Sequence, residues 1–254
     1  MVVRELFYIC ESERKFNIDS HNFYIKEAQK RLISQFDDLD QEIEMYSEKW
    51  LEEVDQYFDP ERHDPSDFYE SAYDEGINYG MLLSEMRHQT MFSVIAGMYH
   101  QWDKVLREWL VRDARYWGGD NVFYKIWKVD IWFIFDLFER MGWKIRQEAF
   151  FNKLNACRMI VNIYKHGNGD SLNNLREKYP EYFFDYNDED FDKDNWYDHT
   201  SVCLRDENFA EFSHSILEFW KKIPERFFNS DDLIAPDWLN EALEADRQGK
   251  KLKR

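Results

Sequence analysis

The chain has 254 residues, of which 44% are hydrophobic and 18% aromatic, with only 9 Gly and 5 Pro. This scarcity of turn-forming residues favours long helices over a sheet protein with many tight turns, and the length suffices for a substantial core. The formal net charge of -18 disfavours nonspecific binding to nucleic acid or to an anionic membrane, although it leaves room for a local basic pocket.

Three widely separated cysteines, Cys10, Cys157 and Cys203, show no CxxC or Cys/His spacing typical of a metal site. They therefore predict a reducing compartment. The apolar stretch before Glu11 is too short for a signal peptide. The most apolar run, 129–137, is short and contains aspartates, which favours a buried helix over a membrane span. We expect a cytoplasmic protein that does not contact a membrane.

The N-terminal part of the chain is expected to begin with a short strand or a short helix near residues 5–10. Ser20 can cap a helix over residues 21–58, where there is no Pro or Gly and apolar residues recur every three or four positions. Such a narrow apolar seam is typical of a coiled coil or of the long arm of a bundle. We expect residues 1–65 to form an N-terminal segment and a long helical arm, serving as scaffold or as a dimer contact.

Longer helices are predicted through the middle of the chain. Residues 66–117 form one or two helices with Ser66 as the N-cap, and two glycines stop this region. Residues 121–141 are apolar nearly all round and predict the most buried helix. A further amphipathic helix is expected over 150–166, ending at Gly167.

The remaining elements are shorter. A helix over 170–179 and another over 206–227 complete a bundle that we place at residues 66–230. Residues 231–254 are expected to form a short helix, 237–245, and a basic tail. The sequence thus predicts an all-α fold, a bundle of long amphipathic helices with an added N-terminal long helix.

An acidic loop is predicted over residues 185–198, where aspartates alternate with other residues. Alternating acids suggest a calcium loop. However, Lys193 stands where such a loop needs glycine, and no glutamate occupies its twelfth position. A solvated acidic loop is therefore favoured over a metal site.

One helix carries a cluster of residues suited to chemistry. Arg158, Asn162 and His166 are spaced four residues apart and share one stripe of the helix, and Lys165 lies beside the histidine. The histidine can act as general acid or base, the arginine suits a phosphate oxygen, and the asparagine can orient a hydroxyl. The structural alternative is an ordinary helix end, where cations complement the dipole and Gly167 is the C-cap.

Common catalytic and cofactor motifs are absent from the sequence. It contains no GxGxxG or P-loop, no HExxH and no GxSxG. We therefore expect neither a cofactor nor a metal ion.

The segment Asn162-Ile-Tyr-Lys-His166 resembles the HEPN superfamily, all-α domains of bacterial defence and toxin systems. The family motif is an arginine, a polar residue, three further residues and a histidine on one helix. The polar residue, spacer and histidine match here, while Val161 occupies the arginine position and Arg158 lies one turn earlier. The resemblance implies a HEPN-like helical bundle.

Active members of this family are metal-independent ribonucleases that act as homodimers and use the RNA 2′-hydroxyl as nucleophile. The resemblance implies that His166 is the general acid or base and that Arg158 stabilises the charge on phosphorus. Asn162 and Lys165 would position RNA at a local site. Other members have lost catalysis. The alternative is therefore an inactive helical module that binds a cognate protein, as an antitoxin, immunity or regulatory subunit.

Overall fold

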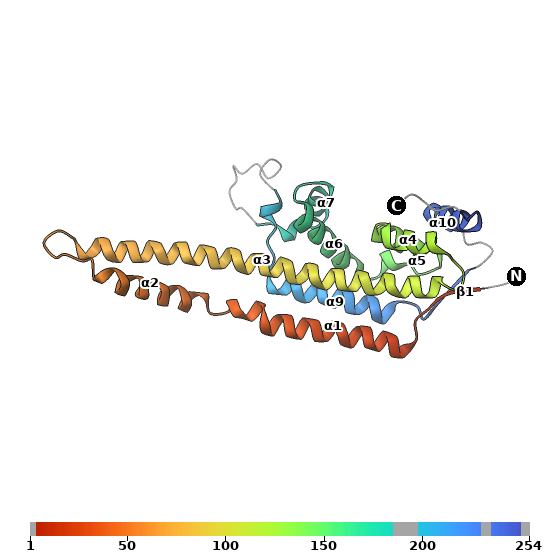
Figure 1. Ribbon diagram of the computed structural model, residues 1–254, viewed down its shortest axis with the longest axis horizontal. Helices are drawn as coiled ribbons and strands as arrows, with labels where there is room; N and C mark the ends of the chain where they lie inside the picture. Colours follow the sequence, from red (N-terminus) through yellow and green to blue (C-terminus); the bar gives the residue numbers. More distant parts are fainter. Residues whose placement is uncertain (1–3, 185–197, 230–234, 250–254) are drawn as a thin grey trace. The chain divides into compact units, whose positions relative to one another are not determined.

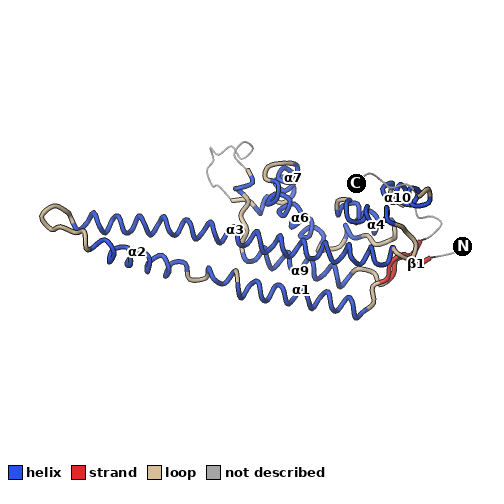
Figure 2. Tube along the Cα trace, in the orientation of Figure 1, coloured by secondary structure: helices blue, strands red, loops and turns tan. Residues whose placement is uncertain are grey.

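A computed structural model describes residues 4–184, 198–229 and 235–249 (Figure 1). Within these ranges most segments are helical, and the only strands are the short β1 (Arg4–Tyr8) and β2 (Arg226–Asn229) (Figure 2). The predicted all-α class is confirmed.

Helices of very different length follow one another along the chain. The α-helices are α1 (Glu11–Arg31), α2 (Leu39–Asp55), α3 (Pro65–Ala114), α4 (Asp120–Lys128), α5 (Ile131–Arg140), α6 (Phe151–His166), α7 (Asp170–Lys178), α9 (Asp206–Lys222) and α10 (Asp237–Arg247). The short 3-10 helices are η1 (Ile33–Phe36), η2 (Ile145–Gln147), η3 (Pro180–Tyr182) and η4 (His199–Ser201).

The chain divides into two compact units. The bundle unit comprises Met1–Tyr24 and Ile95–Arg254, and the hairpin unit comprises Ile25–Val94. Both boundaries fall inside helices, α1 and α3, whereas the domain limits expected from the sequence follow the ends of predicted elements. Those limits stay a prediction.

Aromatic side chains fill the core of the bundle unit. The fully buried ring of Phe219 in α9 has its centroid 5.1 Å from that of Trp102, 5.4 Å from Trp143 and 6.5 Å from Phe138. Phe138 in turn stacks on Phe227 at 5.1 Å. These contacts join α3, α5, α9 and β2 through large apolar surfaces, which dominate the energetics of such cores.

The two strands pair with each other in antiparallel orientation. The indole nitrogen of Trp109 donates to the carbonyl of Tyr8 at 2.9 Å, and that of Trp117 donates to Leu6 at 3.0 Å. Trp109 of α3 and Trp117, just after the end of this helix, therefore hold β1 by its backbone. Of the two alternatives left open near residues 5–10, the strand is observed.

The prediction of one continuous helix over residues 21–58 is wrong, because the helix begins earlier and is interrupted. α1 already begins at Glu11, so Ser20 lies inside the helix instead of capping it. The 3-10 turn η1 then separates α1 from α2. Asp37 and Asp38 lie at this interruption, and aspartate is a weak former of helix interiors because it competes for backbone hydrogen bonds.

The region expected over 66–117 is a single helix of 50 residues, α3. Ser66 is not its N-cap. Instead, Asp64 Oδ1 accepts hydrogen bonds from the backbone N–H of Ser66 at 2.9 Å and from its hydroxyl at 2.7 Å. Pro65 takes the first helical position, where its missing N–H has no cost.

The prediction of a single buried helix over residues 121–141 is wrong, because the segment forms two helices, α4 and α5. Asp130 interrupts it by capping α5, with its Oδ1 accepting from the backbone N–H of Trp132 at 2.8 Å. The buried guanidinium of Arg107 donates to the carbonyl of Val129 at 2.9 Å. Both contacts satisfy backbone groups that an unbroken helix would satisfy itself.

The later helices follow the sequence more closely. The one expected over 206–227 ends early as α9, because Ile223 precedes Pro224 and takes an extended conformation. The helices expected over 170–179 and 237–245 are confirmed as α7 and α10.

In the hairpin unit α2 packs against the first part of α3. The rings of Tyr46 and Tyr79 stack with centroids 4.1 Å apart, and the Tyr79 hydroxyl donates to Glu42 at 2.7 Å. A Cβ at Gly76 would lie 2.1 Å from the hydroxyl oxygen of Ser47. Glycine therefore permits the close approach of the two helices.

Candidate functional site

α6 is buried along most of its length and exposed at its C-terminal turn. Val161, which stands where the motif that this segment resembles has an arginine, is only 2% exposed and belongs to the core. Gly167 ends the helix with φ at +70°, and its N–H donates to the carbonyl of Ile163 at 2.8 Å. A positive φ favours glycine at this C-cap, as expected.

Arg158 lies in the partly buried section of α6, away from the exposed end. Its Nε donates to Asn155 Oδ1 at 3.2 Å, and its guanidinium carbon lies 5.5 Å from the ring centroid of Trp132. Helix side chains lean toward the N-terminus, as this contact with the preceding turn shows. Eight residues of helix, about 12 Å of rise, separate the backbone of Arg158 from that of His166.

The other predicted site residues lie nearer the end of α6. Asn162 is half-buried, while Lys165 and His166 are exposed. The structure therefore brings Lys165 and His166 to one accessible helix end and leaves Arg158 in contact with Trp132. The chemical roles assigned to these residues stay predictions.

A second histidine lies at the same helix end. His199, which begins η4, has its Nδ1 4.0 Å from where a Cβ of Gly167 would stand. Its backbone N–H donates to Asn168 Oδ1 at 2.9 Å, and its Nδ1 lies 3.1 Å from the same oxygen. Gly167 and Asn168 follow His166 directly in the chain, so His199 packs against the residues that end α6.

This double contact selects one tautomer of the neutral His199 ring. A backbone N–H can only donate, so the Asn168 atom that receives it is the amide oxygen. That oxygen can only accept, so Nδ1 of His199 carries the hydrogen in their 3.1 Å contact. In the neutral ring Nε2 then holds the lone pair. A histidine oriented through one nitrogen, with the other available to accept a proton, is the arrangement required of a general base.

Several contacts hold His199 in this position. Asp198 and Ser201 form a capping box around η4, and Val202 pairs with Phe183 in an isolated antiparallel bridge. The N–H of Cys203 donates to the carbonyl of the fully buried Tyr182 at 2.8 Å. The histidine is thereby attached to the bundle core.

The acidic loop predicted over 185–198 lies outside the described residues except for its last position. Asp198 caps η4, and the hydrogen bonds from Thr200 lower its pKa. Among the described residues there is no group of three or more His, Cys, Asp or Glu side chains that could hold a metal ion.

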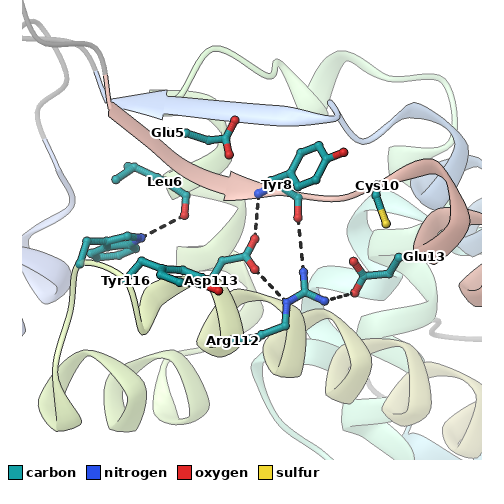
Figure 3. A pocket seen from close by; sticks show the side chains of 9 residues that line it. Glu5, Leu6, Tyr8, Cys10, Glu13, Arg112, Asp113 and Tyr116 are labelled. Carbon is teal, nitrogen blue, oxygen red and sulfur yellow. Dashed lines mark hydrogen bonds and ion pairs between the residues drawn. The ribbon is translucent and has the colours of Figure 1, made fainter.

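A pocket of about 400 Å³ lies elsewhere in the bundle unit, between β1, the start of α1 and the end of α3 (Figure 3). Arg112 crosses it: its Nε donates to Asp113 at 2.9 Å, and its Nη1 donates to Glu13. Burial disfavours the charge of this guanidinium, but these hydrogen bonds outweigh burial and raise its pKa.

The groups in this pocket satisfy one another. Asp113 also accepts from the N–H of Tyr8 at 2.8 Å, and Arg112 donates to the carbonyl of the same tyrosine at 3.3 Å (Figure 3). The cation is thus already neutralised by two carboxylates. This network fastens β1 to α3 and leaves no unpaired positive charge on Arg112 for a ligand.

Comparisons with protein-family models, curated proteins and solved structures find no match. No helix among the described residues is both long and apolar enough to span a membrane. The candidate site is therefore identified from its geometry alone. It lies at the C-terminal end of α6 and includes Lys165, His166, Asn168 and His199.

Proposed function

We propose that the protein is a HEPN-like, metal-independent endoribonuclease of a bacterial defence or toxin system, with its site at the C-terminal end of α6. The observation that carries this proposal is the orientation of His199 by Asn168, which lies two residues after the exposed His166 in the chain. Two imidazoles at one surface can supply both the base and the acid that transfer of a phosphoryl group to a neighbouring hydroxyl requires.

The proposed reaction needs no metal ion. Nε2 of His199 takes the proton of the RNA 2′-hydroxyl, whose oxygen then attacks phosphorus. The bond from phosphorus to the 5′-oxygen breaks, and that oxygen takes a proton from the His166 imidazolium. The products are a 2′,3′-cyclic phosphate and a 5′-hydroxyl end, and Lys165 offsets the charge that develops on the phosphoryl oxygens.

Asn162 and Arg158 have supporting parts in this proposal. Asn162 lies one turn before His166 and positions substrate. Arg158 is held by Asn155 and Trp132, so we expect its removal to reduce cleavage less than removal of either histidine. Following the family resemblance, we also propose a homodimer that brings two such helix ends together, which light scattering at micromolar concentration will test.

The decisive assay is cleavage of fluorescent single-stranded RNA by the purified protein in EDTA. We expect His166→Ala and His199→Ala to lose about 10²–10⁴-fold in rate, and a DNA strand of the same sequence to stay intact. Asn168→Ala should lose activity, while Asn168→Asp should retain it because a carboxylate oxygen can accept both hydrogen bonds.

His100→Ala is the matched control, because His100 is an exposed histidine of α3 with no part in the proposed site. Its rate should equal that of the wild type. An intact RNA after incubation with the wild type, or equal rates in all variants, would contradict the proposal.

A second candidate function is an inactive helical module that binds a cognate protein. The observation that favours it is the engagement of Arg158 with Trp132 and Asn155, which holds the guanidinium in the partly buried section of α6. The net charge of -18 favours it as well. The same assay separates the two candidates, since this module would cleave no RNA.

A further inference from the structure

One face of α3 in the hairpin unit carries a row of exposed apolar side chains. Tyr69, Tyr73, Ile77 and Met81 are spaced four residues apart, and their exposed fractions lie between 45% and 68%. Residues at this spacing form a continuous ridge on a helix surface. We call these four residues the α3 ridge. It extends over about 18 Å of helix, or more than three turns.

The hairpin unit does not bury this ridge with its own chain. α2 occupies the neighbouring face of α3 through Tyr46, Ser47 and Ile43. Among the residues of α2, all of which the structure describes, none is buried. Two helices alone enclose little core, because a helix must bury its apolar stripe against another element.

Charge distinguishes the possible occupants of the ridge. Between Ile25 and Val94 the chain has 18 Asp and Glu against six Lys and Arg, which is a net charge of -12. Exposed acids also border the ridge itself, since Glu70 and Asp74 directly follow its two tyrosines. A second copy of this unit would bring like charges together, which disfavours pairing, whereas a basic surface would be attracted.

We infer that the α3 ridge is the docking surface for a basic amphipathic helix of a partner protein. The partner helix lays an apolar face on the ridge and places its lysines or arginines against the acids that border it. Tyrosine and methionine suit this task because they offer large contact areas and adapt to different side chains. This surface belongs to a different unit from the α6 end, and the inference stands whether or not that end cleaves RNA.

The test uses the full chain and three labelled peptides of about 18 residues, long enough to cover the ridge. One places leucines at helical spacing among lysines. The second scrambles the same composition, so that the charge is kept and the apolar face is lost. The third replaces each lysine by glutamate. Fluorescence anisotropy measures binding of each peptide at low and at high salt.

We expect the amphipathic basic peptide alone to bind, and more weakly at high salt. Tyr73→Gln combined with Met81→Gln should weaken the binding of this peptide by about tenfold or more. Phe16→Gln combined with Phe23→Gln is the matched control, because these phenylalanines are 69% and 68% exposed on α1. This variant should bind the peptide with the affinity of the wild type. Circular dichroism checks that both variants are folded.

Three results would overturn the inference. The first is equal binding of the scrambled peptide, since only bulk charge would then act. The second is unchanged affinity in the ridge variant. The third is a wild-type dimer in light scattering that the ridge variant converts to monomer, because the occupant would then be a second copy of the chain. A dimer that persists in the ridge variant supports an interface elsewhere and leaves the ridge free for the partner.

Discussion

The two units of this protein use similar residues in opposite ways. In the bundle unit aromatic rings such as Phe219 and Phe138 are fully buried and touch one another. In the hairpin unit Tyr69 and Tyr73 are exposed along a helix whose partner, α2, buries none of its residues. The difference teaches that aromatic content alone does not indicate a core: one unit packs its rings against one another, and the other leaves rings exposed.

The largest expected effect tests the packing of the bundle unit. Phe219→Ala should destabilise the protein by about 3–5 kcal/mol, because it leaves a cavity among Trp102, Phe138 and Trp143. Urea unfolding followed by tryptophan fluorescence measures the change. Phe16→Ala, at an exposed position, should stay within about 0.5 kcal/mol of the wild type. Similar losses in both variants would remove the contrast between buried and exposed rings.

A smaller effect is expected where the last helix of the bundle unit meets α4. Asp246 of α10 accepts from the backbone N–H of Gly119 at 2.9 Å and of Asn121 at 3.0 Å, so it caps a helix more than 100 residues earlier in the chain. Asp246→Ala should cost about 1–2 kcal/mol, as for other N-caps. Glu244→Ala, exposed on the same helix, should have no measurable effect. Equal stabilities of the two variants would rule out the cap.

The pH dependence of stability provides a third test of the bundle unit. His21 lies buried with its Nε2 3.1 Å from the carbonyl of Ser213, and burial lowers its pKa below the usual 6.5. The unfolded chain then binds a proton first, so this contribution is complete above about pH 6.5 and is lost as the pH falls toward the lower pKa of the folded state.

His21→Gln should therefore flatten the fall in melting temperature between pH 7 and pH 5, which calorimetry over that range will detect. His100→Gln, at an exposed position, should keep the wild-type slope. An unchanged slope in His21→Gln would show that other groups cause the acid sensitivity.

The smallest effect is expected on the α3 ridge. Tyr73→Gln and Met81→Gln remove side chains that are 68% and 66% exposed, so each should change the free energy of unfolding by less than about 0.5 kcal/mol. Differential scanning fluorimetry of the isolated protein measures this. A loss as large as that of Phe219→Ala would mean that the ridge is part of a core, and the contrast between the units would fail.

Much of the fold could be predicted because it depends on local patterns. Gly167 and Pro224 stop helices through their own backbone preferences, and the amphipathic spacing of α6, α7 and α9 is visible in the sequence. The errors came where one side chain decides between continuation and interruption. Asp130 caps α5 inside an apolar run, and the aspartates at 37 and 38 lie between α1 and α2.

Only the part of the candidate site that lies on a single helix could be predicted from the sequence. His166 and Lys165 lie on one helix, so their spacing places them together. His199 is 31 residues from Asn168 in the chain, and the segment that carries it pairs with Phe183 through the bridge at Val202. No local pattern specifies such a pairing. The only sequence signal near it is the Asp198-to-Ser201 spacing of a capping box, which indicates a turn but not its neighbour.

The pairing of β1 with β2 determines when this protein can finish folding during synthesis. An ion pair between Arg226 and Glu5 joins residues 221 positions apart, so β1 has no partner until more than 200 further residues have been made. At 5–20 residues per second, the ribosome leaves that strand edge open for roughly 10–40 s. During this interval the nascent chain exposes an unpaired strand edge and apolar side chains of α3, such as Trp102, that later pack against α9. Expression at lower temperature, or with chaperones that shield nascent chains, should therefore raise the soluble yield.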